Sequence, residues 1–170
     1  MVDISWTEAA RPGLAWLKRR LPAVLFRHFY AQGDLEEDIK VFCDAQDSPE
    51  VYLPKLLQAP TLSFSVSVLN TSPYLDVRLS AVHCLLVANS GGFFGNPFAT
   101  YDRWSGPDLP RGLTIPININ FLLNEFQLQI VQKYLGGEAW IRASLVVWLE
   151  TKIGPVHVSK CFNLARPHTR

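Results

Sequence analysis

Residues that often perform covalent chemistry are sparse in this sequence. His83 and Cys84 are the nearest candidates for a base and its nucleophile. They are consecutive in an apolar, strand-like run, and consecutive strand residues point to opposite faces, so they cannot form a dyad with each other. No G-x-S-x-G motif is present for a serine nucleophile. The sequence therefore predicts no catalytic residues, and we expect a protein that is not an enzyme.

Neither a cofactor nor a metal ion is predicted. Gly91-Gly92 and Gly95 lack the Lys-Ser/Thr of a P-loop and the spacing of a dinucleotide-binding turn. The acidic run from Asp34 to Asp38 could attract a cation. However, carboxylates are expected in the first turn of a helix because the helix dipole favours negative charge there. We therefore interpret this run as a helix start.

The three cysteines are widely spaced and match no zinc-binding motif. Cys84 and Cys161 stand in apolar, strand-like runs, so the sequence predicts both as small buried side chains. A disulfide between these two across a pair of sheets stays open as an alternative. The odd number of cysteines favours a reducing compartment, and we expect a cytoplasmic protein.

The connection between residues 90 and 112 carries five aromatic side chains among glycines and prolines. Aromatic residues on a loop are typical anchors of a binding interface. The alternative is that they fold back as a lid on the edge of the sheets. The partner-binding candidates are Phe93, Phe94, Phe98, Tyr101 and Trp104.

Residues 6–30 have the pattern of an amphipathic helix, with leucines from Leu14 to Leu25 on one stripe. Basic and aromatic residues cover its other faces. Such a helix either packs on the rest of the protein or lies on a membrane surface or a partner. The candidates for membrane or partner contact are Trp16, Lys18, Arg19, Arg20 and Arg27.

The composition narrows the class of partner. A net charge of +1 gives no overall attraction for nucleic acid, and none is expected as a partner. The chain is 48% hydrophobic and 18% charged, with a mean hydropathy of +0.09. This is apolar for a free monomer and favours a surface covered by a protein partner or a membrane. No apolar run reaches the ~20 residues that span a bilayer, and no signal peptide is predicted.

The elements that must position these residues are mostly strands. Apolar residues alternate with Ser, Thr, Asn or Pro from Leu62 to Val68 and from Leu113 to Phe121, as in sheets with one buried face. The interval from Ser90 to Gly112 is predicted as a long connection that could contain a short strand. Strands are predicted near 61–70, 75–88, 113–121, 139–151 and 155–164.

One helix is predicted between the last strands. Asn124 can cap its start and Gln127 can complete a capping box, while Gly136-Gly137 supplies a left-handed stop. A wide apolar stripe around Leu128 and Val131, which also includes Phe126, indicates packing against the sheets.

The predicted fold is mainly β: an immunoglobulin-like antiparallel β-sandwich with one inserted helix and an N-terminal helical extension. Residues 1–55 form the arm and linker, 56–165 the sandwich and 166–170 a tail. Within the arm, a second short helix is predicted to begin at Asp34, with Glu37 closing a capping box. The polar stretch from Asp44 to Pro54 is predicted as linker.

Three segments carry a family resemblance. An alternating strand ends in Asn at Phe64-Ser65-Val66-Ser67-Val68-Leu69-Asn70, Leu75–Leu79 follows it, and Leu113–Ile117 leads into the helix. A strand rich in Val and Trp comes after that helix. In this order, residues 58–164 resemble the group 2 late embryogenesis abundant (LEA) proteins and the water-stress/hypersensitive-response (WHy) domain. The resemblance implies a non-enzymatic β-sandwich associated with stress protection or with membrane-anchored proteins.

The leading functional hypothesis is a non-catalytic interaction module. It attaches to a membrane face or a larger protein assembly through its N-terminal arm and aromatic loop, as an accessory subunit or a peripheral membrane protein. The first alternative is a soluble stress-protective protein of the LEA group 2 type. The second is a small-ligand binder with a pocket near Trp104 and His83.

Overall fold

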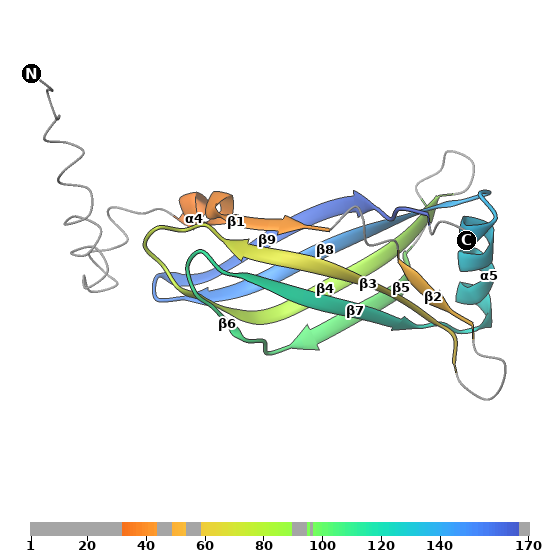
Figure 1. The fold of residues 1–170 in the computed structure, drawn as a ribbon, viewed down its shortest axis with the longest axis horizontal. Coiled ribbons are helices and arrows are strands. Elements are labelled where there is room, and N and C mark those ends of the chain that lie inside the picture. Colours follow the sequence, from red (N-terminus) through yellow and green to blue (C-terminus); the bar gives the residue numbers. More distant parts are fainter. Residues whose placement is uncertain (1–31, 44–48, 54–58, 90–94, 96, 167–170) are drawn as a thin grey trace, which may run out of the picture.

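The protein is a sandwich of two antiparallel β-sheets (Figure 1). The computed structural model describes residues 32–43, 49–53, 59–89, 95 and 97–166. Helix α5 lies at one end of the elongated body, and the short helix α4 lies towards the other end (Figure 1). The predicted mainly-β fold is confirmed. The predicted helix over residues 6–30 lies outside the described residues.

Sheet A is built around β3, which pairs with β7 along one side and with two short strands along the other. The short strands pair with opposite ends of β3. Side chains of β3 alternate between buried and half-buried along its length, as the period-two pattern predicts. The strands of sheet A are β1 (Ile39–Phe42), β2 (Glu50–Tyr52), β3 (Thr61–Asn70) and β7 (Thr114–Leu122).

Sheet B has the strand order β5-β4-β8-β9, and the two-residue β6 pairs with the start of β4. In β8, all five residues predicted to face inwards, from Ile141 to Leu149, are fully buried. The strands of sheet B are β4 (Val77–Asn89), β5 (Pro97–Trp104), β6 (Asp108–Leu109), β8 (Trp140–Thr151) and β9 (Gly154–Asn163).

Aromatic rings from both sheets meet in the core. The ring of Phe64 on β3 stacks against Phe121 of β7 with centroids 6.1 Å apart, and meets Phe162 of β9 edge-on at 6.0 Å. Such contacts add to the free energy that comes from burying the aliphatic residues around them. Inward positions on both sheets therefore share one core.

Helix α5 (Glu125–Leu135) joins β7 to β8, and its capping agrees with the sequence prediction. The Asn124 side chain accepts a hydrogen bond from the Gln127 amide, and Gln127 Oε1 accepts one from the Asn124 amide. Gln127 Nε2 also donates to the Phe98 carbonyl at 2.6 Å, which ties the helix to β5. The stop is confirmed as well, because Gly137 has a φ of 87°.

Replacing Asn124 with alanine should lower the free energy of unfolding by about 1 kcal/mol, because the Gln127 amide loses its acceptor. Urea denaturation would measure the change. Asn124→Ser, which keeps an acceptor oxygen, should lose only a few tenths of this amount. Equal losses in the two variants would contradict the capping role.

Several local predictions were wrong at the N-terminal side. Helix α4 (Gln32–Asp38) begins before Asp34, so that residue lies in the first turn and does not occupy the predicted cap position. Residues 50–52, predicted as linker, form β2. Strands of three or four residues are too short to show a period, and pairing with β3 decides their conformation. The strands of sheet A therefore begin before residue 56, where the sandwich domain was predicted to start.

Three side chains predicted as buried are exposed. Cys161 pairs with Ser144 on the outer face of sheet B and is exposed, so the predicted burial of this thiol is wrong. Cys84 is fully buried on the inner face, and none of the three cysteines, all of which lie within the described ranges, forms a disulfide. Leu113 precedes β7, and Phe126 lies in the first turn of α5, and both are more than half exposed. Burial fails at these element ends because the facing sheet no longer covers them.

Candidate functional site

Two tryptophans stand on the outer face of sheet B with a small residue between them. The strand register places Trp104 of β5, Ala81 of β4 and Trp148 of β8 in one row across the sheet. The indoles are 78% and 44% exposed, whereas Ala81 is only 6% exposed. Because Trp104 and Trp148 are two strands apart, their backbones lie about 9.5 Å from each other. We call this arrangement the tryptophan slot: two indole walls over an alanine floor.

A β-bulge in β4 turns the floor residue outwards. Leu79 points into the core, and the register shifts between Leu79 and Ala81, so Ala81 faces the outer side. The chain after Trp104 is fixed at the same place, because the amides of Ser105 and Gly106 donate to the carbonyls of Ser80 and Leu79. A Cβ on Gly106 would lie 2.5 Å from the Leu79 side chain, so glycine allows this close approach.

The slot belongs to a hollow of about 650 Å³. This volume falls within the range of small-ligand sites. Most of its exposed lining is apolar, and its polar groups lie on either side of the row along the strands, His83 and Asp102 on one side and Ser80 and Glu150 on the other. The lining residues are Ser80, Ala81, Val82, His83, Asp102, Trp104, Trp148 and Glu150.

His83 and Asp102 form the polar pair at one end of the slot. They are cross-strand neighbours, and His83 Nδ1 lies 2.5 Å from Asp102 Oδ1. Both side chains are more than one third exposed, so solvent screens the pair and its net contribution to stability is about 0–1 kcal/mol. The carboxylate does hold the imidazole in one orientation beside the slot. Among the described residues, no serine, threonine or cysteine side chain forms a hydrogen bond with His83.

Trp148 is supported from its other side by His157 of β9. The two rings have centroids 5.3 Å apart and are tilted by 37°. The register pairs these two residues directly, so the imidazole extends the row by one strand. This contact restricts the Trp148 indole on one side. Trp148 also lines the hollow.

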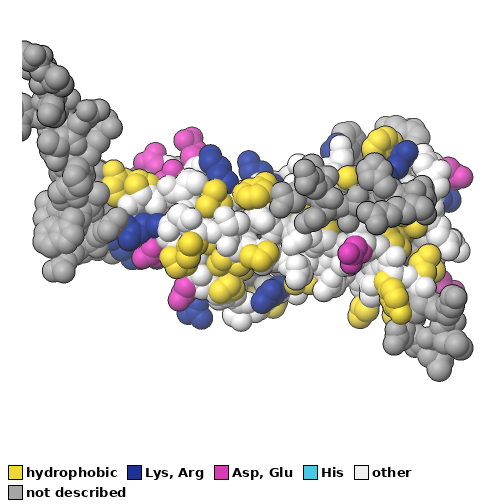
Figure 2. Space-filling model, viewed as in Figure 1, with side chains coloured by type: hydrophobic (Ala, Val, Ile, Leu, Met, Phe, Trp, Pro, Cys, Tyr) yellow, Lys and Arg dark blue, Asp and Glu magenta, His cyan; other side chains and the backbone are white. Residues whose placement is uncertain are grey.

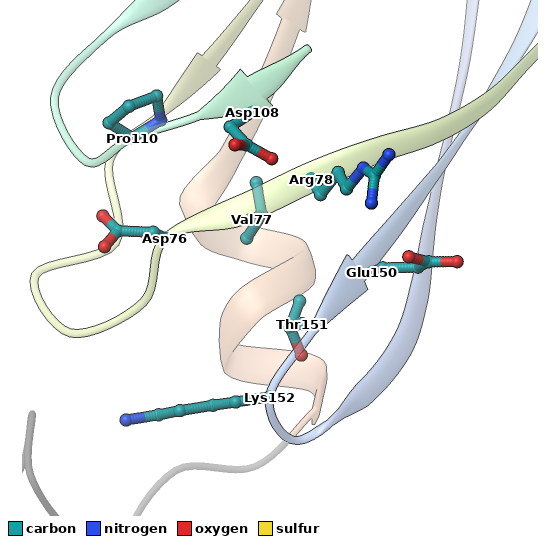
Figure 3. A pocket seen from close by; sticks show the side chains of 8 residues that line it. All are labelled: Asp76, Val77, Arg78, Asp108, Pro110, Glu150, Thr151 and Lys152. Carbon is teal, nitrogen blue, oxygen red and sulfur yellow. The ribbon is translucent and has the colours of Figure 1, made fainter. Parts of the chain in front are cut away.

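A second hollow, of about 480 Å³, adjoins the slot because Glu150 lines both. It carries charges of both signs. Arg78 is the cross-strand neighbour of Asp108 and of Glu150, and Figure 3 shows its side chain on the strand between theirs. This arrangement gives Glu150 a cationic neighbour. The lining residues are Asp76, Val77, Arg78, Asp108, Pro110, Glu150, Thr151 and Lys152.

The rim of this second hollow is held by an ion pair. Arg111 donates from Nε to Asp76 Oδ1 at 3.0 Å and from its amide at 3.1 Å. The pKa of Lys152 is lowered by burial and by the nearby Arg111 guanidinium, while Asp76 opposes the shift. Because opposite charges are interleaved here, the second hollow shows no preference for an anion or a cation. In the described part of the chain, no three His, Cys, Asp or Glu side chains are grouped to hold a metal ion.

The five aromatic candidates of the predicted connection do not share one role. Phe98, Tyr101 and Trp104 belong to strand β5. Phe98 and Tyr101 pack against the core, and the Tyr101 hydroxyl donates to the Asn118 carbonyl across the sheets. Of these three, only Trp104 is largely exposed. Phe93 and Phe94 lie outside the described residues, as do Trp16, Lys18, Arg19, Arg20 and Arg27 of the arm.

Sequence reasoning placed an alternative pocket near Trp104 and His83 and missed the slot residues Ala81, Asp102, Trp148 and Glu150. The alternation in β8 does place Trp148 on the outer face, which is a usable signal. The pairing of β5 with β4 was not predictable in the same way, since residues 90–112 were interpreted as a connection. Without that pairing, nothing in the sequence brings Trp104 to the same row as Trp148.

The outer face of sheet A has a different chemistry. Serines on β3 pair with asparagines on β7, as Ser63 with Asn120 and Ser65 with Asn118. Figure 2 views the molecule from this side and shows mainly uncharged side chains over the middle of the face. Some exposed hydrophobic residues on or next to this sheet lie towards the α5 end (Tyr52, Leu53, Leu122 and Phe126), and others, Phe42 and Leu113, lie towards the α4 end.

No protein-family model matches this sequence, and the curated proteins contain no match. Several solved structures resemble it at low identity. The X-ray structure of Northeast Structural Genomics Consortium target SoR45 is 11% identical, with a TM-score of 0.50, covering 80% of this chain and 92% of that one. A crystal structure described as an ApaA protein from Bordetella pertussis is 16% identical, with a TM-score of 0.46, covering 78% of this chain and 96% of that one.

The similar structures also include a solution structure described as an LEA protein. It is 10% identical, with a TM-score of 0.38, and the match covers 98% of this chain and 94% of that one. At these identities, structural similarity concerns the fold, and function depends on the residues of the site. None of the helices in the described ranges has the length and apolar character required to cross a membrane.

Proposed function

We propose that this protein is a non-catalytic binding module and that the tryptophan slot on the outer face of sheet B is its contact surface. The observation that carries the proposal is the pair of exposed indoles on either side of Ala81. Tryptophan is among the residues that contribute most to binding interfaces. Burying a large aromatic side chain gains about 1.5–3 kcal/mol, so covering two of them would support a specific contact.

The rigid position of the slot supports the same proposal. Its three central residues come from paired strands, and backbone hydrogen bonds hold the chain just after Trp104 to β4. A site on paired strands loses little conformational entropy on binding. The proposal assigns no chemical step to His83 and Asp102, which act as hydrogen-bonding groups at the rim.

Attachment through the N-terminal arm is the second part of the proposal. It rests on the sequence alone: an amphipathic pattern with Trp16 and the basic residues Lys18, Arg19, Arg20 and Arg27. In this scheme the arm holds the protein on a membrane face or a larger assembly in the cytoplasm, and the slot takes the partner. The stress-protective function implied by the resemblance to LEA group 2 stays a prediction, and no geometric observation favours it.

The proposal predicts where small probes bind. The full chain, labelled with ¹⁵N, would be titrated with a fragment mixture of aromatic, saccharide and cationic compounds and followed by amide shifts. We expect shifts to cluster on β4, β5 and β8 around Ala81. Trp104→Ala should weaken this response at least tenfold, because one wall of the slot is lost.

Trp140→Ala is the matched control. Trp140 is an exposed tryptophan at the start of the same strand as Trp148, about 26 Å away, and it stacks with Arg166 instead of lining the slot. This variant should retain the response. Shifts that cluster elsewhere, such as on Tyr52 and Leu122, or an equal loss in both variants would overturn the assignment of the slot.

A further inference from the structure

We propose that the tryptophan slot is a saccharide site, in which one pyranose ring stands between Trp104 and Trp148 over the methyl group of Ala81. This inference rests on the proposed binding function and specifies its ligand. A pyranose has two faces of C–H groups and a rim of hydroxyl groups. The slot offers indole walls for the faces, and hydrogen-bonding groups at both ends for the rim.

The width of the slot fits one ring. Side chains stand roughly perpendicular to a sheet, so two upright indoles two strands apart have ring planes about 9.5 Å from each other. Each stacked carbon contact needs about 3.5–4 Å, and a puckered sugar ring fills the remainder. The contact with His157 keeps the Trp148 ring at its own side of the gap. An alanine floor is essential, because a longer side chain at this position would occupy the same space.

The charge balance favours a neutral ligand over a cation. Asp102 is paired with His83, and Glu150 has Arg78 as its cross-strand neighbour. Each carboxylate of the slot therefore has a hydrogen-bonding or cationic neighbour on an adjacent strand, which reduces the free energy that a cation between the indoles would gain.

The polar rim also argues against a purely apolar ligand. Such a ligand would remove water from the carboxylates and the imidazole without replacing their hydrogen bonds, which costs free energy. Adjacent hydroxyl groups both donate and accept hydrogen bonds. They can donate to Asp102 and Glu150, and can pair with Ser80 and His83, which line the same hollow.

The test is a titration of the full chain with maltotriose, cellotriose and chitotriose, followed by amide shifts and tryptophan fluorescence. Tetramethylammonium and free arginine serve as cationic probes, and indole as an apolar one. We expect at least one saccharide to bind with a Kd of about 1 mM or below, as for a small ligand with one ring in contact. The cations and indole should bind at least tenfold more weakly.

Ala81→Leu is the decisive variant, because it fills the slot and adds no charge. It points to the outer face, so the core should be unaffected, and the amide spectrum would verify that the variant is folded. Saccharide binding should fall at least tenfold in Ala81→Leu and in Trp148→Ala, but remain unchanged in Trp140→Ala. Retained binding in Ala81→Leu would overturn the site.

The outcomes separate the two proposals. If a cationic or apolar probe binds at the slot and no saccharide does, the saccharide inference is overturned while the binding module stands. If no probe of any class shifts the residues around Ala81, both are overturned. Saccharide binding that survives loss of either indole would mean a different site and would also overturn the inference.

Discussion

Replacing Asn70 with alanine is expected to lower the free energy of unfolding by about 3–5 kcal/mol. Asn70 is fully buried at the end of β3. Its Nδ2 donates to the carbonyls of Leu75 at 2.9 Å and Leu109 at 3.1 Å, and its Oδ1 accepts from the Ser72 amide at 3.0 Å. The substitution leaves these three backbone groups without a partner, and each buried polar group in that state costs about 1–3 kcal/mol.

The location of Asn70 explains why its replacement should destabilise the whole sandwich and not only one turn. Its side chain joins the end of β3 in sheet A to the connection before β4 and to β6 of sheet B. Its own carbonyl accepts from the Gly112 amide at 2.7 Å. One side chain therefore fixes the crossing between the sheets at this end of the sandwich.

Asn120→Ala is the matched control for Asn70→Ala. Asn120 is an exposed asparagine on β7 of the same sheet, and its loss should cost no more than about 0.5 kcal/mol. Urea denaturation of both variants gives the comparison. Similar midpoints for the two variants would show that Asn70 does not hold the crossing.

Alkaline pH should destabilise the fold through Cys84. Burial, with a smaller contribution from the charge of Cys43, raises the pKa of the Cys84 thiol from 9.0 to about 12. Between these values the unfolded chain has lost a proton that the folded chain keeps, so the free energy of unfolding falls as pH rises. The contribution is fully present below pH 9, and its loss amounts to about 4 kcal/mol by pH 12.

The measurement is the free energy of unfolding at pH 8 and at pH 11. Over this interval the free energy of unfolding of Cys84→Ala should fall by about 3 kcal/mol less than that of the unaltered chain. At pH 8 its free energy of unfolding should already be about 1 kcal/mol lower, because the side chain is smaller. Tyr134 adds to the alkaline loss in both proteins, since burial raises its pKa to about 12. Cys161→Ala removes an exposed thiol, and its free energy of unfolding should fall between pH 8 and pH 11 by as much as that of the unaltered chain. Equal slopes in all three would contradict the prediction.

The period of the hydrophobic residues was sufficient to predict the long strands. In β3 and β8 the buried residues alternate as expected, because one face of each strand packs on the other sheet. The capping box of α5 was equally local, since Asn124 and Gln127 are three residues apart and need no other part of the fold. Features of this kind depend on neighbours in the chain.

The predictions that failed depend on neighbours in space. β2 has three residues and no recognisable pattern, and it exists because β3 offers it backbone partners. Cys161 lies in an apolar run but falls opposite Ser144 on the solvent side, which only the register of β9 decides. Exposed Phe126 shows the same limit, since a stripe on a helix does not reveal where the sheet beneath it ends.

The sequence by itself determined that this chain forms two layered sheets with an aliphatic interior, because burial of one strand face requires the period-two pattern. Only the tertiary structure decided where a ligand could bind. Trp104 and Trp148 are 44 residues apart in the sequence, and they form one slot because a bulge in β4 turns Ala81 outwards between them. A local pattern indicates which face of a strand a residue occupies, but it does not indicate which strand lies beside it, and that pairing is a long-range property.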